Sequence, residues 1–167
     1  MLARERVAPE IALLIQAIDE AYDRRTWHGT NLRGAVRRVS HEEALWRPAP
    51  GRHCIWEIVL HCAYYKYVQA RVLTGRHGRG LFPRKPSNWP ALPRAAGEVP
   101  WREDVALMDE YHQVLREAVN GFDSQRLGEG DGRWTFAQHV HGAAFHDLYH
   151  AGQIQLLKRL RRTRPKP

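Results

Sequence analysis

Two histidines lie one helical turn apart near the end of the chain. His146 and His150 belong to the run HDLYHAGQI. On a helix, residues at this i,i+4 spacing project from one face, so their ring nitrogens can bind the same metal ion. The spacing alone is weak evidence, because roughly 0.6 such pairs are expected by chance in a chain with this many histidines. Two ordinary core or surface histidines are the alternative interpretation.

The pair gains weight from the long helix that is predicted over residues 135–161. Thr135 and Gln138 have capping-box spacing at its start, and no proline follows before Pro165. A glycine inside a helix costs about 1 kcal/mol against alanine, so Gly152 suggests that a backbone or ligand comes close. At 100° per residue, the inward stripe of this helix comprises Phe136, His139, Ala143, His146, His150, Gln153, Ile154 and Leu157.

A second predicted helix, residues 54–74, also carries a histidine on its apolar stripe. That stripe contains Cys54, Ile58, His61, Tyr65, Val68 and Val72. A lone histidine in such a place is more often a hydrogen-bonded core residue than a ligand. In a helix bundle, however, metal sites are built from inward side chains on different helices. His61, His146 and His150 could therefore form a three-imidazole site with positions left open for water or substrate.

The chemistry of such a site is that of a divalent metal. Three imidazoles suit Zn²⁺ best, and Ni²⁺, Fe²⁺ or Cu²⁺ would also bind. The ion could bring a water to a pKa of about 7 or capture a thiol as the thiolate. Glu57 could orient a ligand imidazole or act as a base, although a carboxylate that meets the helix dipole is the alternative. His139, about 10 Å along the helix axis from His146, is interpreted as pocket lining or as a group that supports a metal ligand, with an ordinary core residue as the alternative.

Other polar residues near the predicted site have weaker claims. Tyr149 and Gln153, like Tyr64 and Tyr65, could donate hydrogen bonds to a bound group, or could simply pack. His141 falls on the outer face of its helix. Surface roles suffice for the remaining histidines, which are His28, His41, His53, His77 and His112.

The predicted elements favour an all-α, four-helix bundle. Ser40 and Glu43 form a capping-box match before a further brief helix. Residues 75–100 contain five prolines and four glycines, with Phe82 and Trp89 but no helical period. Such a long connection is either functional or disordered, and its aromatic residues favour an ordered flap. The four long helices are expected at residues 9–24, 54–74, 101–120 and 135–161.

The length of 167 residues is typical of a single domain, expected here over residues 1–167. Cys54 and Cys62 are interpreted as free thiols in a reducing compartment. With no apolar leader or membrane-spanning run, the expected location is cytoplasmic. The net charge of +8 comes mainly from a basic tail, residues 158–167. This tail is interpreted as solvated, with a non-specific contact to phosphate or to an acidic surface as the alternative, so specific nucleic-acid binding is not favoured. Gly-rich phosphate loops, G-x-S-x-G and C-x-x-C motifs are absent from the sequence.

Three segments together resemble the DinB-like (YfiT-like) superfamily. They are FHDLYHAGQIQLLKRL, IWEIVLHCAYYKY and WHGTNLRGAVRRVSHEEALWRPAPGRH. The resemblance places the metal triad of the family on His61, His146 and His150. It implies a bundle of up-down-down-up topology with long connections around the second long helix, and a homodimer.

The resemblance also suggests a function. Characterised relatives include metal-dependent transferases that join low-molecular-weight thiols, such as bacillithiol or mycothiol, to electrophiles. Others are described as metal-dependent hydrolases, and many have no known activity. The leading hypothesis is a thiol S-transferase that acts on a small-molecule substrate with the thiol as co-substrate. Hydrolysis by a metal-activated water and a non-catalytic metal or small-ligand binding module are the alternatives.

Overall fold

Four long helices and two short ones make up the described part of the chain, in a computed structural model that describes residues 7–76 and 82–163. No strand occurs among these residues, so the prediction of an all-α protein is confirmed. A short 3₁₀ turn, Ser124–Arg126, precedes the last helix. The α-helices are α1 (Pro9–Tyr22), α2 (Leu32–Val36), α3 (His41–Leu45), α4 (Ile55–Leu73), α5 (Glu98–Asn120) and α6 (Phe136–Thr163).

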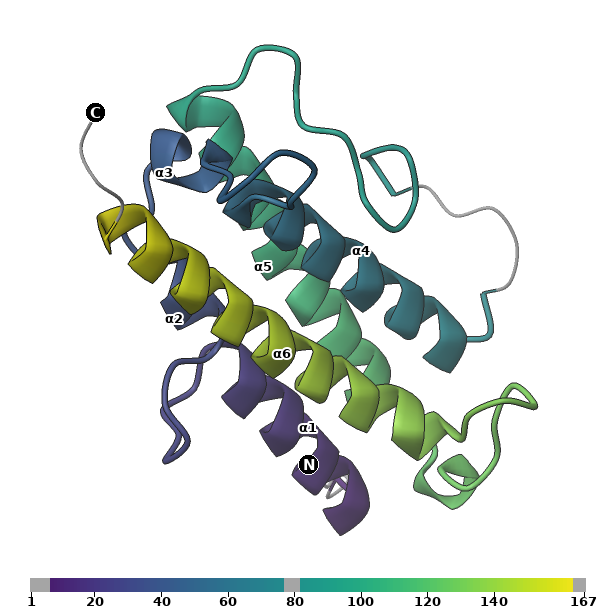
Figure 1. The fold of residues 1–167 in the computed structure, drawn as a ribbon. Helices are drawn as coiled ribbons and strands as arrows, with labels where there is room; N and C mark the ends of the chain where they lie inside the picture. Colours follow the sequence, from purple (N-terminus) through teal and green to yellow (C-terminus); the bar gives the residue numbers. More distant parts are fainter. Residues whose placement is uncertain (1–6, 77–81, 164–167) are drawn as a thin grey trace, which may run out of the picture.

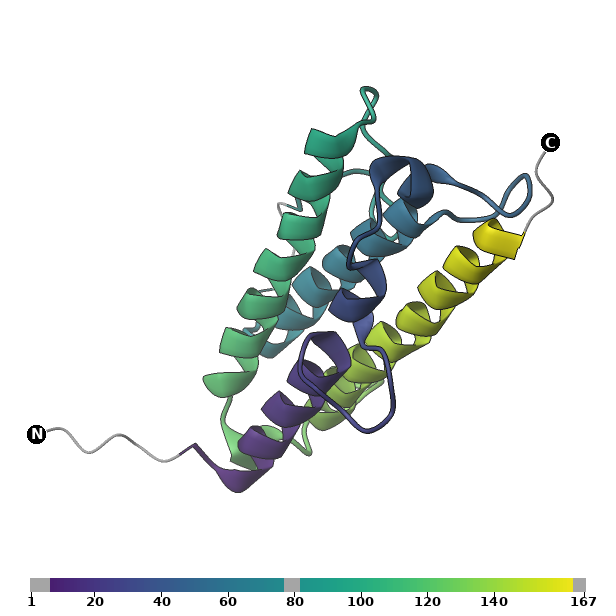
Figure 2. The same ribbon diagram turned by 90° about the vertical axis from the view of Figure 1, so that its left-hand side faces the viewer.

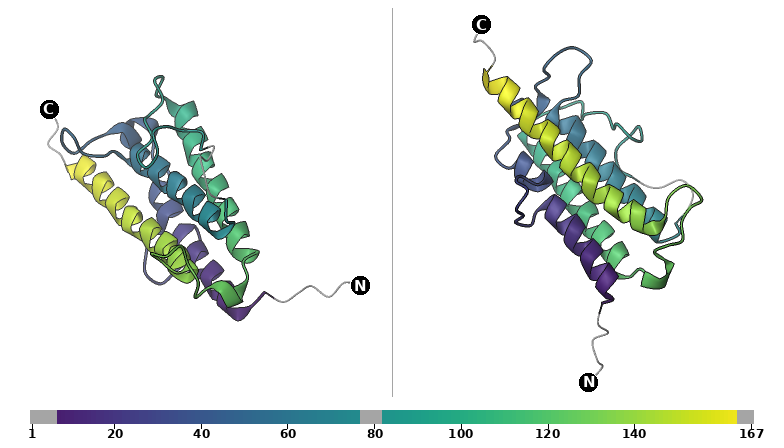
Figure 3. Two further views of the ribbon diagram at one scale, coloured as in Figure 1. Left: turned by 90° about the vertical axis from the view of Figure 1, so that its right-hand side faces the viewer. Right: turned by 60° about the horizontal axis from the view of Figure 1, so that its bottom comes forward.

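The four long helices pack side by side. Helix α4 packs against α5 and α6, and α1 packs against the same two helices. In Figure 1, α1 and α6 run in one direction and α4 and α5 in the other. Two further views, Figures 2 and 3, show the short helix α3 near the end of the bundle where α4 and α5 begin, and α2 between the end of α1 and α3. This arrangement sets α4 beside α6, the two helices that carry the three histidines.

Local signals determine where the helices begin. At the start of α6, the Thr135 amide donates to Gln138 Oε1 at 2.8 Å and the Gln138 amide donates to Thr135 Oγ1 at 3.2 Å. This reciprocal pair is the predicted capping box. Helix α5 begins at Glu98, three residues before the prediction, because Pro100 falls in its first turn, where a missing N–H costs nothing.

Buried neighbours fix the backbone around His61. Ile58, Val59, Leu60 and Cys62 are all nearly inaccessible and belong to the larger hydrophobic core cluster. Such close packing holds the helix in one rotation about its axis, so His61 can point only toward α6 and the flap. None of the described helices combines the length and apolar content needed to cross a membrane.

Two expectations were wrong. His112, assigned to the surface, is 1% exposed, stacks on Tyr22 at 3.9 Å and lies 3.3 Å from Asp19. It occupies the apolar stripe of α5, so the helical period could have revealed its burial. Gly152 is exposed, and a Cβ there would meet nothing within 4 Å, so no backbone or other group of the described chain approaches it. His77 and tail residues 164–167 lie outside the described residues.

Candidate metal centre

Three imidazole rings from two helices meet at one point between α4 and α6. His61 Nε2 lies 3.1 Å from His146 Nε2, which lies 3.1 Å from His150 Nε2. All three ligand atoms fall within 4.8 Å of one another. Nitrogens bound tetrahedrally to Zn²⁺ at about 2.05 Å would stand about 3.3 Å apart, so the observed spacing suits one ion.

Hydrogen bonds at the far side of two rings determine their tautomers. His61 Nδ1 lies 2.7 Å from the Asn88 carbonyl oxygen, and His150 Nδ1 lies 2.7 Å from Gln153 Oε1. Because these oxygens only accept, both Nδ1 atoms carry the proton and both Nε2 atoms keep a lone pair. At least two lone pairs therefore face the same point, which is the arrangement that a cation stabilises and that metal-ligating histidines adopt.

Burial keeps these rings neutral. His61 is 6% exposed and His150 is 4% exposed. Burial lowers the pKa of His61 below its usual range and that of His150 to about 4, although the hydrogen bonds to Asn88 and Gln153 act in the opposite sense. Burial, followed by repulsion from the other two histidines, lowers the pKa of His146 to about 3. Neutral imidazole is the form that binds metal, so protons compete little at neutral pH.

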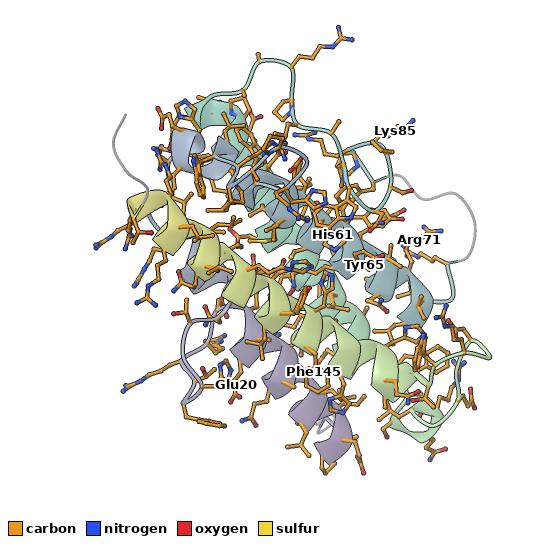
Figure 4. The ribbon with its side chains drawn as sticks, viewed as in Figure 1. Glu20, His61, Tyr65, Arg71, Lys85 and Phe145 are labelled. Atoms are coloured by element: carbon orange, nitrogen blue, oxygen red, sulfur yellow. The ribbon has the colours of Figure 1, made fainter. Side chains whose placement is uncertain are left out.

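The part of the flap around Trp89 covers one side of the triad. The Trp89 ring stacks on His61 at 3.9 Å and, on its other face, on His53 at 3.6 Å. His53, assigned to the surface by its sequence context, is exposed but forms the outer layer of this stack. Asn88 and His53 belong to irregular segments without a periodic pattern, so neither could be placed at the site from the sequence. Figure 4 labels His61 and Tyr65 on α4, and the rings of both residues approach the ring of His146.

A cavity of about 630 Å³ opens beside the three rings, all of which line it. Its walls include Ile58, Trp89 and Leu157, and its polar lining includes Arg52 and His53. This volume lies within the range of pockets that bind small molecules, about 300–1,000 Å³. The described lining contains no carboxylate. The arrangement can hold a metal ion at the wall of a mainly apolar chamber.

The sequence matches the DinB superfamily over residues 23–154, a stretch that spans the three histidines, the flap and most of the bundle. The chain belongs to the DinB superfamily. No curated protein and no solved structure matches it.

Two weaker site candidates lie apart from the triad of this DinB superfamily member. Glu57 accepts two hydrogen bonds from Arg47, at 2.6 and 2.7 Å, and one from the Cys54 amide at 2.9 Å. Burial raises the pKa of Glu57, but the hydrogen bonds from Arg47 and the Cys54 amide outweigh it and lower that pKa to about 2. The contact with the Cys54 amide is that of a helix cap, and Glu57 Oε2 also lies 3.3 Å from Nδ1 of His53, the outer ring of the stack. His139 lies between Gln69 Oε1 at 2.9 Å and Asp131 Oδ2 at 3.1 Å and lines a different cavity, of about 390 Å³.

The other two candidates touch the triad. Gln153 orients His150, as described above. Tyr149 is 64% exposed at the mouth of the larger cavity, with its ring 5.1 Å from that of His150. Tyr149 is therefore placed to contact a ligand, whereas Gln153 acts through His150.

A second group of potential ligands in this DinB superfamily member consists of Cys62, His146 and Asp147. Asp147 forms a buried ion pair with Lys66, which occupies its carboxylate. Burial raises the pKa of the Cys62 thiol well above its usual range, so the thiol stays protonated. The three histidines carry no carboxylate already engaged in an ion pair and no protonated thiol, so they are the better site.

Proposed function

We propose that the protein binds a divalent metal ion through His61, His146 and His150 and transfers a low-molecular-weight thiol to an electrophilic small molecule. The observation that carries this proposal is the meeting of three neutral Nε2 atoms at the wall of a cavity of about 630 Å³. Zn²⁺ suits the donor set best, with Ni²⁺ or Fe²⁺ as alternatives. A metal with open coordination positions would lower the pKa of a bound thiol, so that the thiol is a thiolate at neutral pH.

The cavity lining favours thiol transfer over hydrolysis. Hydrolytic metal sites commonly pair the ion with a carboxylate that takes a proton from water, as the Glu of H-E-x-x-H does. The described lining has no carboxylate, and Glu57 is engaged by Arg47. Apolar walls at Ile58, Trp89 and Leu157 suit the body of an electrophile, and the Arg52 guanidinium suits an anionic group on either reactant.

The activity is testable with Zn²⁺-loaded protein, a panel of thiols and 1-chloro-2,4-dinitrobenzene. We expect thiol-dependent turnover that His61→Ala abolishes and His141→Ala retains, since His141 is exposed on the same helix as two of the ligands. Ester hydrolysis without any thiol would instead establish the hydrolase. Tight Zn²⁺ binding with neither activity would assign a non-catalytic binding module. Elemental analysis of protein from its native host would identify the metal.

We also infer a homodimer formed through the outer face of α6. Four large apolar side chains of this helix are exposed on one face, at spacings of four, seven and four residues. They are Phe145, Tyr149, Leu156 and Leu160. Leu156→Glu should shift the protein to monomer in sedimentation, and Leu13→Glu, at an exposed leucine of α1, should not. The two buried free cysteines support the predicted cytoplasmic location.

A further inference from the structure

A basic groove of about 940 Å³ lies away from the three histidines, between the loop after α1, helix α2 and the C-terminal part of α6 (Figure 1). Five arginines of the 23–38 segment line it, together with Lys158 and Arg162 of α6. Only two carboxylates, Asp23 and Glu43, share the lining. Residues more than a hundred positions apart thus bring seven cations to one concave surface.

The two carboxylates do not neutralise this charge. The nearest cation to Asp23 is Arg24 at 3.7 Å, and the nearest to Glu43 is Arg161 at 3.9 Å, which is not part of the lining. Within residues 7–76 and 82–163, no carboxylate lies within ion-pair distance of Arg25, Arg37, Arg38 or Arg162. Arg33 is paired with Asp109 at 2.8 Å, a carboxylate outside the lining, so it adds little net charge. The remaining cations keep a positive potential in the groove that a bound anion would offset.

Lys158 is held in place among these cations. Its Nζ donates to the Ala35 carbonyl oxygen at 2.8 Å, which ties α6 to α2. Burial lowers the pKa of Lys158, and repulsion from Arg162 and Arg37 lowers it further, although Glu43 acts in the opposite sense. The interpretation of Lys158 as part of a solvated tail was therefore wrong. A bound anion would relieve the repulsion among these cations.

We propose that this groove binds a small molecule that carries two or more phosphate groups. Guanidinium groups match phosphate oxygens through paired hydrogen bonds, and arginine supplies most of the positive charge here. A concave site of this volume suits a compact ligand, whereas a nucleic-acid backbone is followed by an extended basic stripe. The groove shares no lining residue with the cavity beside the histidines, so this proposal does not depend on the proposed function.

Titration calorimetry with tripolyphosphate in metal-free buffer tests the proposal. We expect binding that weakens as salt rises from about 50 to about 200 mM. The double variant Arg37→Glu/Arg162→Glu should weaken it by at least about tenfold, since each charge-assisted contact contributes substantially. The matched control is Arg159→Glu, because Arg159 is exposed on the same helix but lies outside the lining. That variant should change the affinity by less than about threefold.

Further measurements separate this site from the metal centre and from nucleic acid. His150→Ala should bind tripolyphosphate as the wild type does, and its loss of binding would overturn the proposal by assigning the anion to the histidines. Equal weakening by Arg159→Glu would reduce the effect to net charge and also overturn it. A single-stranded oligonucleotide that binds more tightly than tripolyphosphate, with a steeper salt dependence, would assign the surface to nucleic acid instead. Absence of tripolyphosphate binding at low salt would refute the site directly.

Discussion

Zn²⁺ should stabilise the folded protein, and the loss of one histidine should remove this effect. His61 belongs to α4, whereas His146 and His150 belong to α6, so the three rings come together only in the native state. An ion that needs all three binds the folded chain far better than the unfolded chain. Binding free energy then becomes folding free energy.

The expected magnitude follows from mass action. At a free Zn²⁺ concentration of one hundred times the dissociation constant, the free energy of unfolding should rise by about 2.7 kcal/mol. For a chain of this length, each kcal/mol raises the melting temperature by about 2–4 °C, so we expect a shift of about 5–10 °C. Protons that compete for the ring nitrogens should reduce the Zn²⁺ affinity only slightly at pH 7, because burial lowers the pKa of His146 to about 3 and that of His150 to about 4.

Differential scanning fluorimetry of metal-stripped protein, with and without buffered Zn²⁺, provides the assay. His150→Ala should show a shift below about 2 °C, whereas His141→Ala should keep the full shift, because His141 is exposed and lies outside the triad. An undiminished shift in His150→Ala would refute the three-histidine site. A shift lost equally in both variants would point to non-specific binding by surface histidines.

Three further outcomes follow from contacts near the site and in the core. Trp89→Ala should speed the transfer of bound Zn²⁺ to a chelator by about tenfold, because the ring that covers His61 is removed, and an unchanged rate would contradict this role. Lys66→Met should lower the free energy of unfolding, measured by urea titration, by about 3–5 kcal/mol because it leaves the buried Asp147 unpaired. The double variant Lys66→Met/Asp147→Leu should lose much less stability, and additive losses would refute the pairing. Burial, aided by Lys66, lowers the pKa of His112 to about 3, so between about pH 6.5 and 3 only the unfolded state takes up this proton. As the pH falls, His112 alone should therefore lower the free energy of unfolding of metal-free protein by up to about 1.4 kcal/mol per pH unit, in addition to the contributions of His146 and His150, so His112→Phe should reduce the slope by that amount and an unchanged slope would contradict this role.

Local sequence was sufficient to predict the four long helices. The Thr135 and Gln138 capping box begins α6 where the spacing predicts, because both hydrogen bonds join residues three apart. The family match over residues 23–154 confirms the assignment to the DinB superfamily. The start of α5 was less accurate, since nothing local distinguishes Pro100 before a helix from Pro100 in its first turn.

The surroundings of the site could not be predicted in the same way. The stack of His53, Trp89 and His61 joins a loop, the flap and α4, and no periodicity relates residues in irregular segments. At Gly152 the sequence predicted a contact that is not there: a glycine inside a helix suggested that a backbone or ligand comes close, but the residue faces open space in the described chain. Packing between distant segments determined both outcomes.

By itself, the sequence determined which side chains share a face, because the 3.6-residue period is a property of the isolated helix. His146 and His150 are neighbours on α6 for that reason, and His61 lies on the inward stripe of α4. Only the tertiary structure decided that α4 lies beside α6, that Asn88 and Gln153 fix the tautomers, and that Lys158 meets the arginines around α2. Those contacts depend on how the helices pack, and packing is a property of the whole chain.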